Sequence, residues 1–147
     1  MMRKILVPTD GSKLSTKAVN AAIDLAKVFD ARLVALHVYP KFAGTPYGTF
    51  GPAGDVLKEA HERAGRARAD ELFVDIGKLA EAAGVELEST LVVSNEVWKE
   101  VIVVAKRKKC DLICMASHGR RGLAALVLGS ETQKVLTHST LPVLVVR

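Results

Sequence analysis

The feature that most constrains the fold is the alternation of short aliphatic runs with longer segments of helical periodicity. Between the runs, apolar residues recur every three or four positions, as on one face of a helix. Strands that alternate with helices are typical of a parallel sheet covered by helices on both faces. Right-handed crossovers then favour an open, doubly wound α/β sheet. The runs with the length of buried strands are residues 4–8, 32–38, 85–93, 111–116 and 142–147.

The longest helical segment is expected at residues 55–83, before Gly84, which can terminate a helix. Before it lies a Gly- and Pro-rich loop, residues 39–54, longer than most connections. We expect this loop to be either a functional lid or a mobile insertion. Ser94 is expected to cap the next helix, in which Trp98 faces inward. The apolar residues of the long helix that we expect on one face are Leu57, Ala60, Ala64, Ala67, Leu72, Ile76, Leu79 and Ala83.

The positive charge of the chain is compatible with an anionic partner, but its distribution does not favour nucleic acid. The formal net charge is +5, and much of the excess comes from the basic run at residues 106–109. This run falls at the expected end of a helix, where cations suit the helix dipole. No aromatic residues are interleaved with it, as stacking on single strands would need. We therefore expect no nucleic-acid partner.

The two cysteines and the apolar runs favour a cytoplasmic protein. Cys110 and Cys114 are about 13 Å apart if they share one strand, too far for a disulfide. They are expected to be reduced, buried thiols rather than metal ligands. The apolar start stops at Pro8, unlike a signal peptide, and the longest apolar run, residues 123–128, is too short to span a bilayer. We expect one domain over residues 1–147, with no membrane insertion.

Two segments of special composition follow the first and fourth expected strands. One runs from Pro8 to Ser12 and contains Thr9, Asp10 and a glycine, and the other covers residues 115–122. In an open parallel sheet, ligands bind outside the carboxyl ends of the strands, where the strand order reverses. If these two strands are neighbours, both segments meet in one crevice.

The second segment leads to a predicted helix N-terminus that can bind an anion. Ser130 and Gln133 form a capping-box pattern directly after Gly129. Unpaired N–H groups at such a terminus favour phosphate, and Gly119 lets the backbone approach the same anion while Arg120 adds charge. The alternative is that these glycines serve only as turn residues. Neither a P-loop nor a G-x-G-x-x-G pattern is present.

Residues 115–130 resemble the motif of the universal stress protein family. That motif reads glycine, two residues, glycine, nine residues, glycine, then serine or threonine, and here Gly119 is followed by nine residues and then Gly129 and a serine. Residues 5–12 and 142–146 are also similar to the opening and the ending of the family's sequences. The resemblance covers essentially the whole chain and implies the strand order 3-2-1-4-5, with the first and fourth strands side by side.

The resemblance implies a site for ATP or another adenine nucleotide, with Mg²⁺ or Mn²⁺ on its phosphates. Asp10 would lie by the ribose, and the backbone near Val38 would meet the adenine edge. The glycines and Ser130 would hold the phosphates. The residues implied in nucleotide binding are Pro8, Thr9, Asp10, Val38, Met115, Ala116, Gly119, Arg120, Gly129, Ser130 and Glu131.

Two positions depart from the family's motif. Ala116 stands where the first glycine is expected, and its methyl group can crowd the ribose. Glu131 follows the serine where an apolar residue is more usual, and its carboxylate would repel a nearby phosphate. The alternative to a nucleotide-binding stress protein is therefore a dimeric interaction module with a weak or empty pocket.

The final strand is expected to form a dimer contact, and the chain carries no catalytic motif. The apolar strand from Pro142 to Arg147 would expose unpaired backbone groups at a sheet edge, and the resemblance implies a homodimer through it. No catalytic base or Walker-type lysine is found, so ATP hydrolysis is expected to be slow at most. A small enzyme that uses Asp10 and a metal is a third hypothesis.

Overall fold

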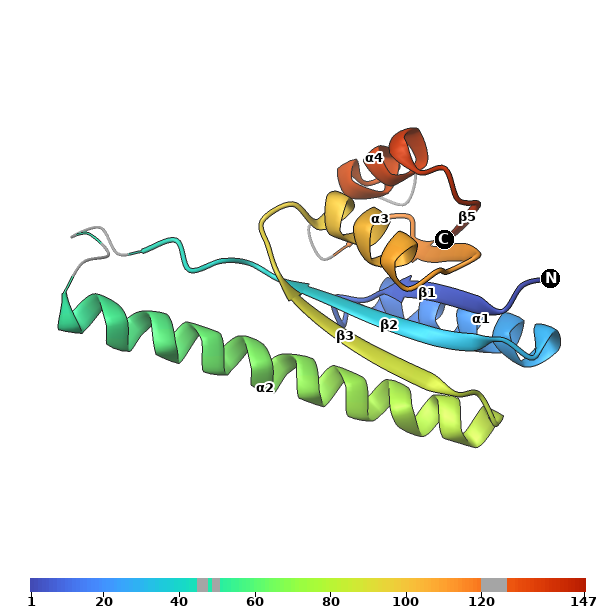
Figure 1. Cartoon of the computed structure of the whole chain (residues 1–147), viewed down its shortest axis with the longest axis horizontal. Helices are drawn as coiled ribbons and strands as arrows, with labels where there is room; N and C mark the ends of the chain where they lie inside the picture. Colours follow the sequence, from blue (N-terminus) through green and yellow to red (C-terminus); the bar gives the residue numbers. More distant parts are fainter. Residues whose placement is uncertain (45–47, 49–50, 120–126) are drawn as a thin grey trace.

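The computed structural model describes residues 1–44, 48, 51–119 and 127–147 (Figure 1). Within these residues, five parallel strands form one sheet in the order β3-β2-β1-β4-β5, which confirms the predicted doubly wound α/β fold. The elements, in chain order, are β1 (Lys4–Pro8), α1 (Lys13–Phe29), β2 (Arg32–Tyr39), α2 (Pro52–Ala83), β3 (Leu87–Val93), α3 (Val97–Arg107), β4 (Leu112–Ala116), α4 (Ser130–His138) and β5 (Val143–Val146).

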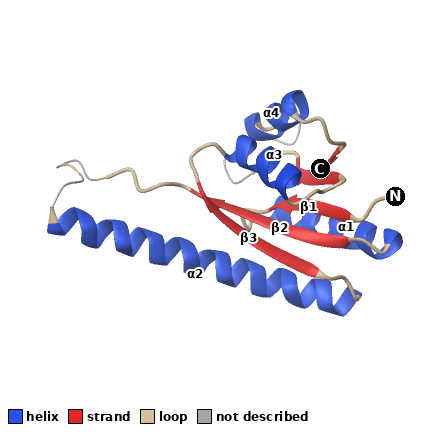
Figure 2. Ribbon diagram, in the orientation of Figure 1, coloured by secondary structure: helices blue, strands red, loops and turns tan. Residues whose placement is uncertain are grey.

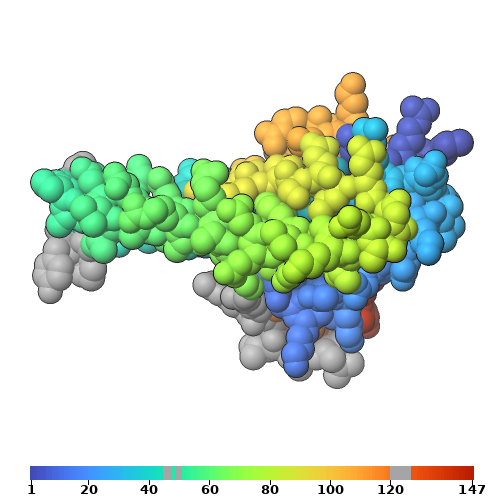
Figure 3. All heavy atoms as spheres, turned by 90° about the horizontal axis from the view of Figure 1, so that it is seen from below, coloured from blue at the N-terminus to red at the C-terminus, as the bar shows by residue number. Residues whose placement is uncertain are grey.

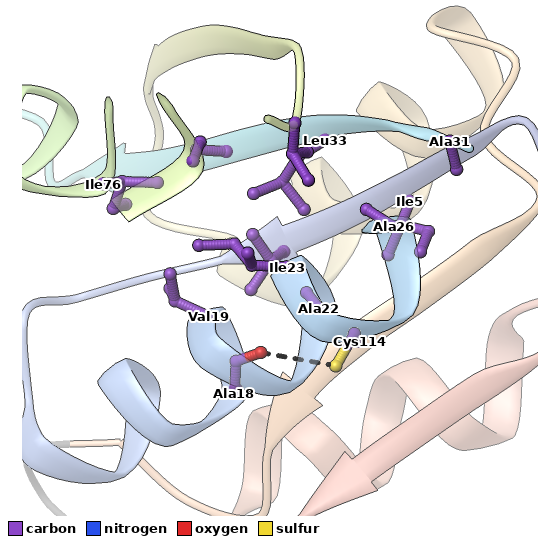
Figure 4. Close-up of a cluster of buried hydrophobic side chains, with 14 of the residues drawn as sticks. Ile5, Ala18, Val19, Ala22, Ile23, Ala26, Ala31, Leu33, Ile76 and Cys114 are labelled. Carbon is purple, nitrogen blue, oxygen red and sulfur yellow. Dashed lines mark hydrogen bonds between the residues drawn. The ribbon is translucent and has the colours of Figure 1, made fainter. Parts of the chain in front are cut away.

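The helices cover both faces of the sheet because successive strand residues point to opposite sides (Figure 2). On one face, Ile5 and Leu33 pack with Ile76 of α2 and with the small side chains of α1 (Figure 4). On the other face, Leu6 packs with Val101 of α3. The strands β1, β2 and β4 therefore contribute to two separate clusters of buried residues, which explains why these three strands are apolar almost throughout.

The strand order reverses beside β1. Ile5 of β1 pairs with Leu33 of β2 on one side and with Leu112 of β4 on the other. The chain leaves β1 through α1 toward β2, whereas β4 continues through α4 toward β5 on the opposite side. The carboxyl ends of β1 and β4 are thus the point where a doubly wound sheet forms its ligand crevice.

Helix α2 differs from its predicted outline. It begins at Pro52, three residues earlier than expected, so the expected loop 39–54 is shorter, and residues 45–47 and 49–50 of that loop lie outside the described part. The single apolar face was also a wrong prediction. Leu72 and Ile76 are buried, but the residues at positions 57, 60, 64, 67 and 79 of that series are exposed. The step from Ala67 to Leu72 turns the helix by about 140°, which moves the series to another face.

Two predicted helix caps are not formed. Gly129 occupies the N-cap position of α4 and has no side chain, so the predicted Ser130–Gln133 capping box is not formed. Ser94 lies before the N-cap of α3, and its hydroxyl accepts a hydrogen bond from the backbone N–H of Glu96 at 3.2 Å. Trp98 is only half-buried and packs on the ring of His138, with ring centroids 4.8 Å apart.

Both cysteines are buried and free, as the sequence predicted. The thiol of Cys114 donates to the carbonyl oxygen of Ala18 in α1, at 3.5 Å (Figure 4). Burial raises the pKa of Cys110 and of Cys114 to about 11. In the part of the chain that is described, no helix combines the length and apolar character needed to cross a membrane.

Candidate functional site

The loop after β1 is held in place by short local hydrogen bonds. The N–H of Thr9 donates to the carbonyl oxygen of Leu36 at 2.8 Å, which extends the β1–β2 pairing into the loop. The carboxylate of Asp10 accepts the N–H of Ser12 at 2.9 Å, and Ser12 in turn caps α1. Gly11, between them, has a φ of 78°, a conformation that favours glycine. The side chain of Asp10 is therefore held at the carboxyl end of β1.

His37 ties β2 to the same loop. Its Nδ1 atom lies 2.8 Å from the carbonyl oxygen of Thr9. Because a carbonyl oxygen only accepts, Nδ1 is the donor in this contact. Nε2 is buried and has no hydrogen-bond partner within the described residues. His37 therefore links β2 to the loop after β1 while its second ring nitrogen stays buried.

The two predicted segments meet where Gly119 lies against Asp10. A Cβ atom added at Gly119 would come within 2.8 Å of Oδ2 of Asp10. Contacts this short are essentially absent from real side chains, so a larger residue at position 119 would require the Asp10 carboxylate to move. The loops after β1 and β4 therefore converge, as predicted from their composition.

Gly129 joins this loop to the start of α4. Its N–H donates to the carbonyl oxygen of Ser117 at 2.7 Å, and a Cβ here would lie 3.0 Å from the Cα atom of His118. Its φ is −63°, so glycine is required by the close backbone approach and not by conformation. Ser130 follows as an exposed first helical residue. Gly129, the N-cap residue of α4, offers no side chain to cap the first N–H groups of the helix, and such groups suit an anion.

Glu131 is engaged with α3. The backbone N–H of Trp98, in the first turn of α3, donates to its Oε2 atom at 2.8 Å. Lys134 lies 3.6 Å from the other carboxylate oxygen. The carboxylate therefore satisfies the N-terminus of a neighbouring helix, a role that spacing along the chain does not reveal.

Ala116 and Met115 lie on opposite faces of the sheet. The methyl group of Ala116 belongs to the buried cluster on the α1 face, and its carbonyl oxygen accepts the hydroxyl of Thr132 at 2.8 Å. Met115 packs in the cluster on the α3 face. The methyl group that replaces the motif's first glycine is thus accommodated by core packing. Both residues are nearly fully buried.

One cation near the site was missed from the sequence. The guanidinium of Arg68, on α2, lies against Gly11, where its Nη2 atom is 2.3 Å from the position a Cβ would take. Glu71 is its ion-pair partner at 3.5 Å. No sequence spacing links α2 to this loop, so only the fold brings the two together. Arg120, the predicted cation, lies outside the described residues.

Two further observations limit the site. Among the described residues, no three His, Cys, Asp or Glu side chains are grouped so that they can hold a metal. A hollow of about 670 Å³ lies elsewhere, between α2 and the ends of β2 and β3, and Tyr39 and His61 are among its lining residues. The candidate site lies instead at the carboxyl ends of β1 and β4, where the two loops converge beside the N-terminus of α4.

Comparisons with known proteins agree with this fold and identify the family. The universal stress protein family matches residues 1–147. The universal stress protein YxiE of Bacillus subtilis is 37% identical over 152 residues, and the match covers all of this chain and all of YxiE. The UspA structure from Lactobacillus plantarum superimposes with a TM-score of 0.86 at 24% identity, covering 99% of this chain and 98% of that one.

A universal stress protein solved in complex with cAMP is also similar. Its TM-score is 0.72 at 28% identity, and the match covers 99% of this chain and 97% of that one. The family match and the identity to YxiE both extend over the full length of this chain. The chain therefore belongs to the universal stress protein family.

Proposed function

We propose that the crevice between β1 and β4 binds an adenine nucleotide, with ATP as the first candidate. The bound nucleotide would change the dimer or partner state of the protein in a stress response. The observation that carries this proposal is the convergence of Gly119 on Asp10 beside the uncapped N-terminus of α4. Such a terminus and a nearby carboxylate suit the phosphate and ribose ends of one ligand.

The described residues fit a nucleotide in polarity. The backbones of Gly119 and Gly129 approach Asp10 and His118 closely, and Ser130 is exposed at the helix start. The related protein solved with cAMP supports the adenine class. In this proposal Pro8, Thr9, Met115 and Ala116 line the base and sugar.

A divalent ion would arrive with the phosphates. Since the described residues offer no group of three ligands, Mg²⁺ or Mn²⁺ would be held mainly by the nucleotide itself. With no Walker-type lysine in the sequence, hydrolysis would be slow at most. We assign the protein to the cytoplasm, where ATP is abundant.

Calorimetric titration of ATP, AMP and cAMP in the presence of magnesium tests the proposal. We expect micromolar binding by the wild type and at least about tenfold weaker binding by Gly119→Ala, because a methyl group would collide with Asp10. Gly129→Asp should abolish binding, since it places a carboxylate at the phosphate position. Gly77→Ala is the matched control, because its added methyl would meet nothing closer than 3.9 Å. Equal binding by all variants would disprove the assignment of the crevice.

The second candidate is a dimeric interaction module with a weak or empty pocket. β5 lies at a sheet edge and Leu144 on it is 39% exposed, which suits a homodimer that forms through residues 142–147. If wild type binds no nucleotide and Leu144→Lys halves the mass of a dimer in light scattering, this candidate is preferred. A monomer of 15.8 kDa at micromolar concentration would exclude it.

A further inference from the structure

Helix α3 begins with a backbone donor that is satisfied from another helix. Trp98 is the second residue of α3, and the side chain of the N-cap residue, Glu96, makes no capping hydrogen bond within the described residues. The N–H of Trp98 donates instead to Oε2 of Glu131, the second residue of α4, at 2.8 Å. An N–H group at this position has no partner within its own helix, and a carboxylate suits the positive end of the helix dipole. Glu131 therefore caps α3 from α4.

The same tryptophan contacts the other end of α4. Its ring packs on the ring of His138, the last residue of α4, with centroids 4.8 Å apart. Glu131 and His138 are seven positions apart, close to two helical turns, so both lie on the face of α4 that is turned toward α3. The two helices pack next to each other (Figures 1 and 3). Trp98 thus holds the first turn of α4 through its backbone and the last turn through its ring.

The first turn of α4 is also held from the side of β4. The N–H of Gly129 donates to the carbonyl oxygen of Ser117 at 2.7 Å. The hydroxyl of Thr132 donates to the carbonyl oxygen of Ala116 at 2.8 Å. Ser130, which lies between these anchors in the chain, is exposed. The start of α4 is therefore held from two directions, by β4 and by α3, while its exposed serine remains accessible.

We propose that Glu131 is a positioning residue for the phosphate end of the nucleotide and acts through its hydrogen bond to Trp98. This inference rests on the proposed function, because it concerns how the same site is held. The N–H groups at a helix start stabilise an anion when they point at it together, and this effect falls off within the first turn. A tilt of the first turn of α4 would therefore weaken phosphate binding without changing the residues assigned to the base and sugar.

The charge of Glu131 is compensated by groups other than a ligand. One carboxylate oxygen accepts the N–H of Trp98, and Nζ of Lys134 lies 3.6 Å from the other. Removing this side chain would have two opposing effects on a bound phosphate. Loss of the negative charge would favour the phosphate, whereas loss of the acceptor would release α4 from α3. A test must therefore remove the charge with and without the acceptor.

Two neutral substitutions in the full chain separate these effects. Glu131→Gln removes the charge but keeps a carbonyl oxygen that can accept the N–H of Trp98, whereas Glu131→Ala removes both. In calorimetric titrations with magnesium, Glu131→Ala should bind ATP about three- to tenfold more weakly than Glu131→Gln, the range given by one net hydrogen bond. Adenosine has no phosphate, so its affinity should be equal in the two variants. The same loss for adenosine as for ATP would contradict a role at the phosphate end.

Amide hydrogen exchange of Trp98, followed by NMR without ligand, gives an independent readout. The amide should be protected in the wild type and in Glu131→Gln, and should exchange at least about tenfold faster in Glu131→Ala. Gln133→Ala is the matched control, because Gln133 is exposed in the same turn about 200° around the helix from Glu131. It should change neither the exchange rate nor the ATP affinity.

The outcomes for ATP distinguish this inference from the proposed function. If the wild type binds ATP and the Glu131→Gln and Glu131→Ala variants bind it equally well, the positioning role is wrong and the nucleotide site stands. If the wild type binds no ATP, both are wrong. Equal exchange rates of the Trp98 amide in the two variants would also overturn the positioning role.

Discussion

Gly65 provides a sharp test of the packing between α2 and β2. In a helix interior, replacing glycine with alanine normally stabilises by about 1 kcal/mol. At Gly65, however, the added Cβ would lie 2.3 Å from Cδ1 and 2.4 Å from Cε1 of Tyr39. The ring of Tyr39 cannot simply turn aside, because it contacts the His61 ring, with centroids 4.8 Å apart. Overpacking of this kind costs about 1–3 kcal/mol, which exceeds the gain in helix propensity.

We therefore expect Gly65→Ala to lower the free energy of unfolding by about 1 kcal/mol, or to lower the Tm by roughly 2–4 °C. Gly77→Ala, in the same helix, should raise it by about 0.5–1 kcal/mol, because the nearest atom to its Cβ is an ordinary contact at 3.9 Å. Urea unfolding followed by circular dichroism measures both. In a Tyr39→Ala background, Gly65→Ala should become stabilising. If Gly65→Ala stabilises the wild type as much as Gly77→Ala does, the placement of the Tyr39 ring against α2 is refuted.

Three further outcomes follow from burial and charge. Ile113→Ala should lower the free energy of unfolding by about 2–5 kcal/mol in urea titrations, because Ile113 is fully buried; a loss below about 1 kcal/mol would contradict its core position. Burial raises the pKa of Cys110 and Cys114 to about 11, so both thiols should resist alkylation by iodoacetamide at pH 8. Because the unfolded thiols ionise at a lower pH, the free energy of unfolding should fall as the pH rises from 9 to 11. Rapid alkylation of the folded protein, detected by mass spectrometry, would argue against this. The hydrogen bond from Lys108 lowers the pKa of Glu88 below 4.5, a contribution that is present above pH 4.5 and lost as the pH falls below it. Since Glu88 is 40% exposed, Glu88→Gln should cost less than about 1 kcal/mol at pH 7 and less still at pH 3, as thermal unfolding at both pH values can check.

The sequence alone was sufficient to predict the order of elements and the convergence of the loops after β1 and β4. Strands β1 and β4 are buried on both faces, so their residues form uninterrupted aliphatic runs that stand out in the sequence. Glycines at positions 119 and 129 mark a close backbone approach, and the structure shows what each would meet. These signals are local, since each depends on residues that are adjacent or nearly adjacent in the chain.

Contacts between distant segments were decided only by the tertiary structure. Glu131 reaches the N-terminus of α3, and Arg68 reaches Gly11, through packing that no local pattern encodes. The face of α2 that is buried was also decided by the tertiary structure, because the sequence placed all its apolar residues on one face. Spacing identifies an apolar stripe, but only the extent of the sheet decides which stripe is covered. The sequence determined the elements because their periodicity is local, whereas the fold determined which faces and charges meet, because those depend on where each element ends in space.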